Sequence, residues 1–376
     1  MKMNKDLEEI TVVTLEQAVA APYASGKLAQ AGARVIKIER HEGDFARNYD
    51  QDVKGLSAYF VWLNHGKQSV CLNIKDSKDL KTLKNIISKS DVFIQNLMPG
   101  ATDRLGINSK NLRETHPALI TCDISGYGQT GPYSKMKAYD LLIQAESGLA
   151  GINGSPDEPG RVGVSVCDIA AGMTSYQAIL QALIARQKSG KGRGIEVSLF
   201  HSLADWMNVP YLQNHYGKRE IKRAGLHHAT IAPYGAYTCL NGQLVLISIQ
   251  NEREWARLCS QVLNKPDLAT DKNFISNTKR VENRKNLDLI INESFNNISR
   301  EKVIQKLKEA DIAYGQLSSV EDLENHPQSN FINLSTSEGE IKILSPGAII
   351  SGENFNFGKV PFLGEHTDLI KKEFQS

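Results

Sequence analysis

The order of elements in the first forty residues constrains the fold most. Residues 9–15 and 34–38 are apolar runs rich in β-branched side chains. Between them, Pro22 stands where the first turn of a helix would be, and Gly32 follows the segment as a helix-ending residue. A strand, a helix and a second strand are therefore predicted, and such a crossover joins parallel strands.

Later segments repeat this alternation. Residues 79–89 have the apolar spacing of an amphipathic helix, and residues 91–95 and 119–124 are further strand-like runs. We therefore expect an α/β fold with a large open parallel sheet, in which ligands bind beyond the carboxyl ends of the strands.

The sequence pattern in the middle of the chain predicts a domain boundary. Residues 169–189 predict a long, mostly buried helix, which is followed by a strand at 195–199, so the first part of the large domain is expected to span 1–199. We interpret residues 200–222 as a linker. A hairpin around Asn241-Gly242 and amphipathic helices up to about residue 312 predict a small α+β domain over 223–312.

Charge and composition narrow the ligand class. The chain has 376 residues, 44 Lys and Arg against 42 Asp and Glu, and a net charge of +2. No run of like charge predicts nucleic-acid binding, and no apolar stretch predicts a signal or a membrane span, so we expect a cytoplasmic protein that acts on small molecules. The five cysteines are scattered, and residues 17–24 lack a GxGxxG pattern, so neither a metal nor a permanently bound cofactor is expected.

Two kinds of residue are chemical candidates on local grounds. Basic residues near the ends of the first strands could meet phosphates or could be scattered surface charges; they include Arg40, Arg47, Lys75 and Arg104. Asp168 precedes the long helix, where a carboxylate is either an N-cap or a nucleophile at a positive helix end.

Seven segments together resemble the family III CoA-transferases of the CaiB/BaiF type. They occur in family order over nearly the whole chain, at residues 32–40, 43–44, 96–106, 125–132, 139–140, 166–172 and 363–367. The resemblance implies a Rossmann-like large domain, completed by residues 313–376, which comprise the return linker and the C-terminal part of that domain, and an interlocked homodimer. The aromatic linker residues Trp206, Tyr211 and Tyr216 agree with burial against a partner subunit.

The resemblance also implies a reaction. CoA passes from an acyl-CoA, which is a substrate, to a free carboxylic acid. Asp168 matches the catalytic aspartate, which forms a mixed anhydride and then an aspartyl-CoA thioester. Val19, with Ala18 beside it, lines the thioester and offers a backbone donor to an oxyanion, while Tyr139 and Asp140 lie beside the reacting group.

CoA contacts and substrate preference follow from the same resemblance. The CoA nucleotide and pantetheine are expected along Arg40, Leu72, Lys75, Asn96, Arg104 and Lys137. Residues 223–234 lack the glycine-rich loop of oxalate-using members and resemble the branch that acts on C4–C5 dicarboxylates such as mesaconate, itaconate, malate or citramalate. Succinyl-CoA or another dicarboxylyl-CoA is the expected donor.

Two acceptor-binding residues are predicted with alternatives. Arg47, just past the second strand, would meet the distal carboxylate of the acceptor, or else is a surface or CoA-phosphate contact. His228 would close over the acceptor acid, or else is a loop residue without chemistry.

Two other functions remain open. The first is an α-methylacyl-CoA racemase or isomerase, which Tyr139 disfavours because related racemases have a proton-transferring histidine there and tyrosine has an ordinary pKa near 10. The second is a non-catalytic partner subunit of a CoA-transferase, which Asp168 disfavours.

Overall fold

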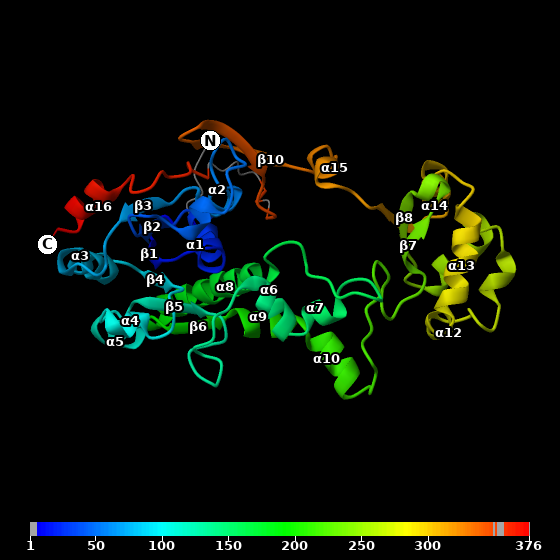
Figure 1. Cartoon of the computed structure of the whole chain (residues 1–376), viewed down its shortest axis with the longest axis horizontal. Coiled ribbons are helices and arrows are strands. Elements are labelled where there is room, and N and C mark those ends of the chain that lie inside the picture. Colours follow the sequence, from blue (N-terminus) through cyan, green and yellow to red (C-terminus); the bar gives the residue numbers. More distant parts are fainter. Residues whose placement is uncertain (1–5, 349, 352–356, 376) are drawn as a thin grey trace. The chain divides into compact units, whose positions relative to one another are not determined.

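The computed structural model describes residues 6–348, 350–351 and 357–375, and it divides the chain into two compact units (Figure 1). The large unit comprises Met1–Leu149, Arg161–Lys218 and Asn330–Ser376, and the small unit comprises Ala150–Gly160 and Arg219–Ser329. The boundaries differ from the predicted ones. Most of the expected linker is helical and belongs to the large unit, and residues 150–160 belong to the small unit.

A six-stranded parallel sheet forms the centre of the large unit, in the order β3-β2-β1-β4-β5-β6. Its strands are β1 (Thr11–Leu15), β2 (Arg34–Glu39), β3 (Gln68–Cys71), β4 (Val92–Gln95), β5 (Ile120–Ser125) and β6 (Gly194–Ser198). This confirms the predicted α/β class with a parallel sheet. Strand β3 was not predicted, because residues 68–71 are too short and too polar to stand out.

Helices cover both faces of the sheet, so its strands are apolar on both sides. Val12 faces a core that includes α1 and α8, whereas its neighbour Val13 faces a core that includes α3, α5 and α16. The helices of the large unit are α1 (Ala20–Gln30), η1 (Phe45–Asn48), α2 (Ala58–Asn64), α3 (Ser77–Ser88), α4 (Ala101–Arg104), α5 (Ser109–Thr115), α6 (Asp140–Glu146), α7 (Leu149–Ile152, at the boundary), α8 (Val166–Ser189), α9 (Leu199–Trp206), α10 (Asn208–His215) and α16 (Thr367–Glu373).

The order in which strands are added to the sheet reverses at β1. Strand β1 pairs with β2 on one side and with β4 on the other, so the crossovers on its two sides run in opposite directions. The crevice beyond the carboxyl ends of two such strands is the usual ligand position in open α/β sheets. The residues that directly follow β1 and β4 therefore lie where a ligand is expected.

The large unit also contains an antiparallel hairpin of β10 (Phe331–Thr336) and β11 (Gly339–Leu344). Leu334 and Ile341 of the hairpin pack in one apolar cluster with Phe60 and Val61 of α2. Segments more than 270 residues apart in sequence thus share one core.

The small unit is built on an antiparallel sheet in the order β7-β8-β9. Asn241 and Gly242 both have positive φ angles, as the predicted tight hairpin requires. Strand β9 pairs with β8. The small unit therefore continues beyond residue 312, the end that the sequence predicted. Its elements are β7 (Tyr234–Thr238), η2 (Leu240–Gly242), β8 (Leu244–Ser248), α11 (Glu252–Arg257), η3 (Leu258–Val262), η4 (Pro266–Ala269), α12 (Asn277–Glu282), α13 (Arg284–Phe295), α14 (Arg300–Glu309), β9 (Ala313–Gln316) and α15 (Val320–Glu324).

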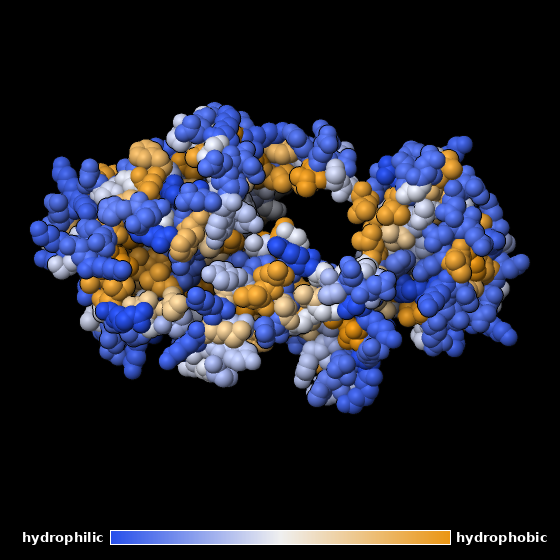
Figure 2. All heavy atoms as spheres, viewed as in Figure 1, coloured by the Kyte–Doolittle hydropathy of each residue, from blue (hydrophilic) through white to orange (hydrophobic). Residues whose placement is uncertain are grey.

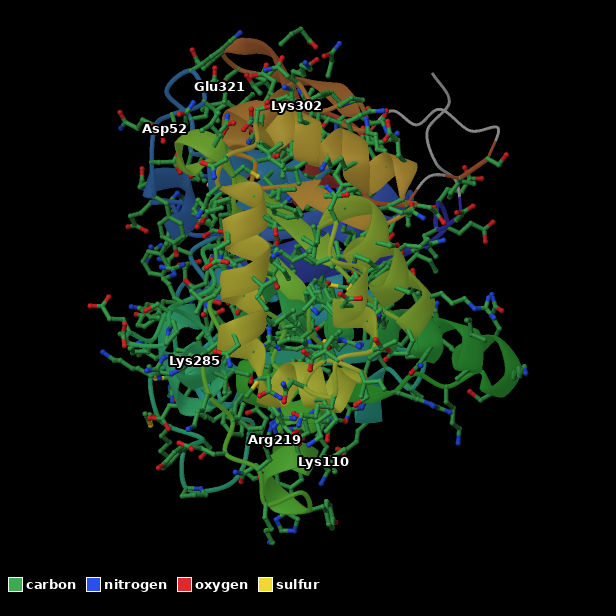
Figure 3. The ribbon with its side chains drawn as sticks, turned by 90° about the vertical axis from the view of Figure 1, so that its right-hand side faces the viewer. Asp52, Lys110, Arg219, Lys285, Lys302 and Glu321 are labelled. Atoms are coloured by element: carbon green, nitrogen blue, oxygen red, sulfur yellow. The ribbon has the colours of Figure 1, made fainter. Side chains whose placement is uncertain are left out.

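On the face that Figure 2 shows, both units carry mostly hydrophilic residues with scattered apolar ones. On the small unit, Lys285 of α13 and Lys302 of α14 are exposed (Figure 3). Across the described ranges of the chain, no helix combines the length and the apolar character needed to cross a membrane.

Candidate active site

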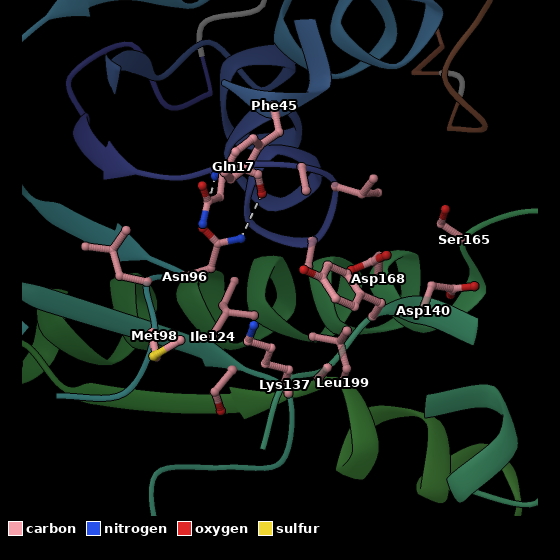
Figure 4. Close-up of a pocket in the computed structure, with 18 of the residues that line it drawn as sticks. Gln17, Phe45, Asn96, Met98, Ile124, Lys137, Asp140, Ser165, Asp168 and Leu199 are labelled. Carbon is pink, nitrogen blue, oxygen red and sulfur yellow. Dashed lines mark hydrogen bonds between the residues drawn. The ribbon is translucent and has the colours of Figure 1, made fainter. Parts of the chain in front are cut away.

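Two adjoining hollows lie at the carboxyl ends of the parallel strands. The first, which we call the switch-point hollow, has a volume of about 830 Å³ and is lined by residues that follow β1, β4, β5 and β6 and by the start of α8 (Figure 4). The second, the adjacent hollow, has a volume of about 670 Å³ and is lined by residues that follow β1, β2, β3 and β4. Gln17 and Leu97 line both hollows, so the two hollows adjoin along these residues.

Asp168 lines the switch-point hollow from the first turn of α8. The helix begins at Val166 with Ser165 as its N-cap residue, so Asp168 lies inside the helix and the alternative of an N-cap is wrong. Among the described residues, its carboxylate has neither a hydrogen bond nor an ion pair. Burial, reinforced by the charge of Asp140, raises the pKa of Asp168 to about 7.

Asp140 connects the starts of two helices. Its Oδ1 atom accepts a hydrogen bond from the backbone amide of Cys167 at 2.8 Å, and its Oδ2 atom accepts one from Nε2 of Gln144 at 2.7 Å. A side chain of α6 therefore satisfies an otherwise unpaired amide in the first turn of α8. Tyr139, just before it, also lines the hollow and is exposed. Figure 4 shows Asp140 and Asp168 on the same side of the hollow.

The turn between β1 and α1 lines the hollow with Ala18 and Val19. Gln17, which precedes this turn, is held by two hydrogen bonds from the Asn96 side chain (Figure 4). The Oδ1 atom of Asn96 accepts from the Gln17 amide at 3.0 Å, and its Nδ2 atom donates to the Gln17 carbonyl at 2.8 Å. Within the described part of the chain, the Val19 amide has no hydrogen-bond acceptor. An unpaired backbone N–H at a pocket wall is the type of group that stabilises an oxyanion.

The structure brings most of the predicted CoA-binding residues to these two hollows. Asn96 and Lys137 line the switch-point hollow, and Arg40, Leu72 and Lys75 line the adjacent hollow. Arg104 lines neither hollow and is exposed on α4.

Arg47 does not lie where the sequence suggested. Its guanidinium group makes two hydrogen bonds of 2.8 Å to the buried carboxylate of Glu39, and it stacks 3.7 Å from the centre of the Phe60 ring. It lines neither hollow. This pairing uses the guanidinium groups that would bind a carboxylate, so a substrate would have to displace Glu39, and the acceptor-binding role of Arg47 stays a prediction.

His228 belongs to the small unit. Its ring stacks on Tyr234 with the ring centres 5.1 Å apart, and its Nδ1 accepts a hydrogen bond from the Thr230 amide. The acceptor-closing role of His228 stays a prediction.

Several lining residues were missed by sequence reasoning. Tyr49 and Tyr59 line the switch-point hollow and contact each other edge to face at 5.5 Å; burial raises the pKa of Tyr49, and the charges of Asp44 and Asp168 add to this shift. Lys135 and Arg161 are further cations on its wall. The aromatic residues between the second and third strands were a visible signal, whereas Arg161 had none.

A model of CoA-transferase family III matches residues 7–367. The chain belongs to this family. The family fixes the class of reaction, since its members are CoA-transferases and act on CoA thioesters as substrates.

Several known proteins match nearly the full length of this chain. The human succinyl-CoA:glutarate CoA-transferase is 33% identical, with the match covering 99% of this chain and 87% of the human protein. The acetyl-CoA:oxalate CoA-transferase of Acetobacter aceti is also 33% identical, with 99% and 97% covered. A crystal structure of a CaiB/BaiF family protein from Brucella suis superimposes with a TM-score of 0.86 at 30% identity, covering 99% of this chain and 100% of the other. Because a glutarate and an oxalate enzyme match equally well, overall identity does not distinguish the acceptor acid.

Proposed function

We propose that this enzyme transfers CoA from a dicarboxylyl-CoA, such as succinyl-CoA, to a free C4–C5 dicarboxylate, with Asp168 as the covalent carrier. The observation that supports this most directly is the position of Asp168. An unpaired carboxylate lies in the hollow at the switch point of the sheet, in the same cavity as the turn that contains Val19. Its raised pKa makes it a more basic, and hence stronger, nucleophile than an ordinary aspartate.

In the first half of the reaction, Asp168 attacks the thioester carbonyl. The carbon–sulfur bond breaks, CoA leaves as a thiolate, and the acyl group and Asp168 form a mixed anhydride. The thiolate then attacks the aspartyl carbonyl of this anhydride and releases the donor acid as a carboxylate. Asp168 now carries CoA as a thioester.

The second half runs the same steps in reverse with the acceptor. The acceptor carboxylate attacks the aspartyl thioester, CoA leaves again as a thiolate, and a new anhydride forms. The thiolate attacks the acceptor carbonyl, which yields the product thioester and frees the Asp168 carboxylate. In each step the Val19 amide is the proposed donor to the oxyanion.

The acceptor requires a cation for its second carboxylate. Among the described residues, the basic side chains on the wall of the switch-point hollow are Lys135, Lys137 and Arg161. Arg161 is the best match, because its planar fork suits a carboxylate and it has no ion pair among the described residues. Lys137 is proposed to contact CoA instead, as Arg40, Leu72 and Lys75 do in the adjacent hollow.

Assembly and location belong to the same proposal. Trp206, Tyr211 and Tyr216 on or beside α9 and α10 are more than half exposed in the single chain. Such a group of large apolar side chains is typical of a protein interface. We propose an interlocked homodimer in the cytoplasm.

Trapping the carrier tests the mechanism. The enzyme is incubated with succinyl-CoA and no acceptor, treated with hydroxylamine or borohydride, and digested for mass spectrometry. We expect the label on the peptide that contains Asp168. Asp168→Asn should abolish label and turnover.

Cys167 supplies the necessary control because its thiol could be acylated by a thioester. The side chain is buried, and burial raises the pKa of its thiol, so Cys167→Ala should keep both label and activity. Label that disappears with Cys167→Ala, or transfer at the wild-type rate by Asp168→Asn, would refute the covalent role of Asp168.

A further inference from the structure

We propose that Asp44 is a positioning residue for the transfer reaction, which holds the Ala18–Val19 turn in the conformation that presents the Val19 amide to the reacting thioester. The inference rests on the proposed function, since it concerns the oxyanion donor of that reaction. Asp44 lines the adjacent hollow, not the one that contains Asp168.

The turn has a conformation that an alanine does not adopt by itself. Ala18 has a φ of 63°, in the left-handed region that favours glycine, because the Cβ of other residues crowds the backbone there. Such a residue persists only where its surroundings over-determine it. The source of that constraint is therefore informative about the turn.

Asp44 provides the constraint directly. Its Oδ1 atom accepts a hydrogen bond from the Ala18 amide at 2.9 Å, across 26 residues of chain, and a second one from the Ala46 amide at 2.9 Å. Together with the two bonds between Asn96 and Gln17, this fixes consecutive peptide groups just before Val19.

Asp44 is itself fixed by a buried charge network. Its Oδ2 atom lies 2.6 Å from Nζ of Lys37, and neither side chain has any exposed surface. The same Nζ lies 3.3 Å from Glu16, which in turn pairs with Lys67 at 2.7 Å.

The network as a whole is electrically balanced. The Asp44 amide donates to Glu39, the partner of Arg47, so three carboxylates face three cations: Glu16, Glu39 and Asp44 against Lys37, Lys67 and Arg47. Burial opposes the charge on Lys37, but the adjacent carboxylates outweigh it and raise its pKa, so the cation opposite Asp44 stays charged.

The network contains more buried charged side chains than are needed to hold a surface turn. A buried network is a poor source of stability compared with apolar packing, but it fixes its members in one geometry. Here the fixed oxygen points at the strained residue of the turn that also lines the hollow of Asp168. Reaction rates respond to displacements of about 1 Å in such groups.

The decisive variant is Asp44→Asn. Its single amide oxygen cannot serve both partners. If the oxygen accepts from the Ala18 amide, the NH₂ group faces the Lys37 ammonium; if the oxygen turns to Lys37, the NH₂ group faces the Ala18 amide and the turn loses its acceptor. We expect the rate of Asp168 acylation by succinyl-CoA, measured by quenched flow, to fall by about 100-fold. The dissociation constant of free CoA should change by less than about threefold, because CoA lacks the thioester carbonyl and the Asp44 side chain has no exposed surface in the adjacent hollow.

A rescue experiment separates positioning from general damage. Glycine adopts the left-handed conformation without the Cβ penalty. Introducing Ala18→Gly into the Asp44→Asn enzyme should therefore recover at least about tenfold of the lost rate, and Asp44→Asn should cost less in the Ala18→Gly background than in the wild type.

Ser69→Ala is the matched control. Ser69 donates to Glu39 in the same network at 2.6 Å but does not touch the turn. We expect it to lower thermal stability while leaving the acylation rate of the folded enzyme unchanged. The inference is overturned if Asp44→Asn acylates at the wild-type rate, if Ala18→Gly gives no rescue, or if Ser69→Ala slows acylation as much as Asp44→Asn does.

Two further outcomes would also decide between the proposals. A wild-type enzyme that never acylates Asp168 would refute the proposed function itself. If Asp44→Asn does not fold, hydrogen exchange on the wild type decides: the Ala18 amide should exchange as slowly as the amides of β1, and exchange at the rate of an open loop overturns the proposal.

Discussion

The Oδ1 atom of Asp140 accepts a hydrogen bond from the Cys167 amide at 2.8 Å, so a side chain of α6 caps the helix that carries Asp168. The same carboxylate acts on Asp168 through its charge. Burial raises the pKa of Asp168 to about 7, and Asp140 adds to the effect. One residue thus orients the helix and makes the neighbouring carboxylate more basic.

The pH dependence of the reaction should follow this coupling. Asp168 attacks only when ionised, so kcat/KM should rise with pH to a plateau, with its midpoint at about 7. Asp140→Asn removes the neighbouring charge but keeps an oxygen for the Cys167 amide, so the midpoint should move to lower pH. A pH–rate profile with succinyl-CoA measures both.

Glu146→Gln is the control for that shift. Glu146 also lies on α6 and is exposed, so the substitution removes the same charge from the same helix without removing the cap. Its midpoint should remain that of the wild type. A midpoint that moves equally in both variants would show that net charge, not the contact of Asp140, sets the profile.

Asp168 should lower the stability of the enzyme that uses it. Its pKa is higher in the folded protein than the ordinary value of 3.8, so the fold favours the protonated form. The stabilisation that the protonated Asp168 carboxyl group provides is present in acid. It is lost as the pH rises from about 4 to 7 and is absent at higher pH. Asp168→Asn should therefore be more stable than the wild type, with a gain that grows to at most roughly 4 kcal/mol at pH 8, at about 1.36 kcal/mol per pKa unit. Denaturant unfolding at pH 5 and pH 8 tests this; equal gains at both would contradict it.

Local sequence patterns predicted the elements but not the contacts between them. The first strand–helix–strand unit, the long helix and the Asn241-Gly242 hairpin are visible because apolar spacing and turn residues specify them locally. The long helix begins three residues earlier than predicted, since its start is capped by Asp140 from another element.

Arg47 illustrates the same limit at the site. Its position after the second strand suggested a substrate cation. In the structure, a turn closed by the Gly43 amide on the Arg40 carbonyl separates that strand from Arg47, and the guanidinium group pairs with Glu39. Which carboxylate a buried arginine meets depends on tertiary contacts. The family motifs found the hollow residues, whereas Arg161, Tyr49 and Tyr59 required the structure.

Breaking the buried network should be costly. Lys37→Met would leave Glu16 and Asp44 without their shared cation in a site with no exposed surface. We expect a loss of about 3–5 kcal/mol in the free energy of unfolding. Glu42→Gln, which removes only the exposed pair with Arg40, should have little effect. Denaturant titrations of both variants give the comparison, and similar losses would mean that burial of the network is not what matters.

The acceptor preference should depend on Arg161 and not on Arg47. If the Arg161 fork binds the distal carboxylate, Arg161→Ala should raise KM for glutarate by about 10-fold to 100-fold, as expected for a lost charge-assisted contact. KM for a monocarboxylate such as butyrate should stay nearly constant. Arg104→Ala, which removes an exposed arginine outside both hollows, is the matched control and should affect neither acid. Arg47→Ala should lower thermal stability by removing the guanidinium partner of the buried Glu39 carboxylate and should change the two KM values alike. A selective loss with glutarate in Arg47→Ala, together with an unaffected Arg161→Ala enzyme, would return the role to Arg47.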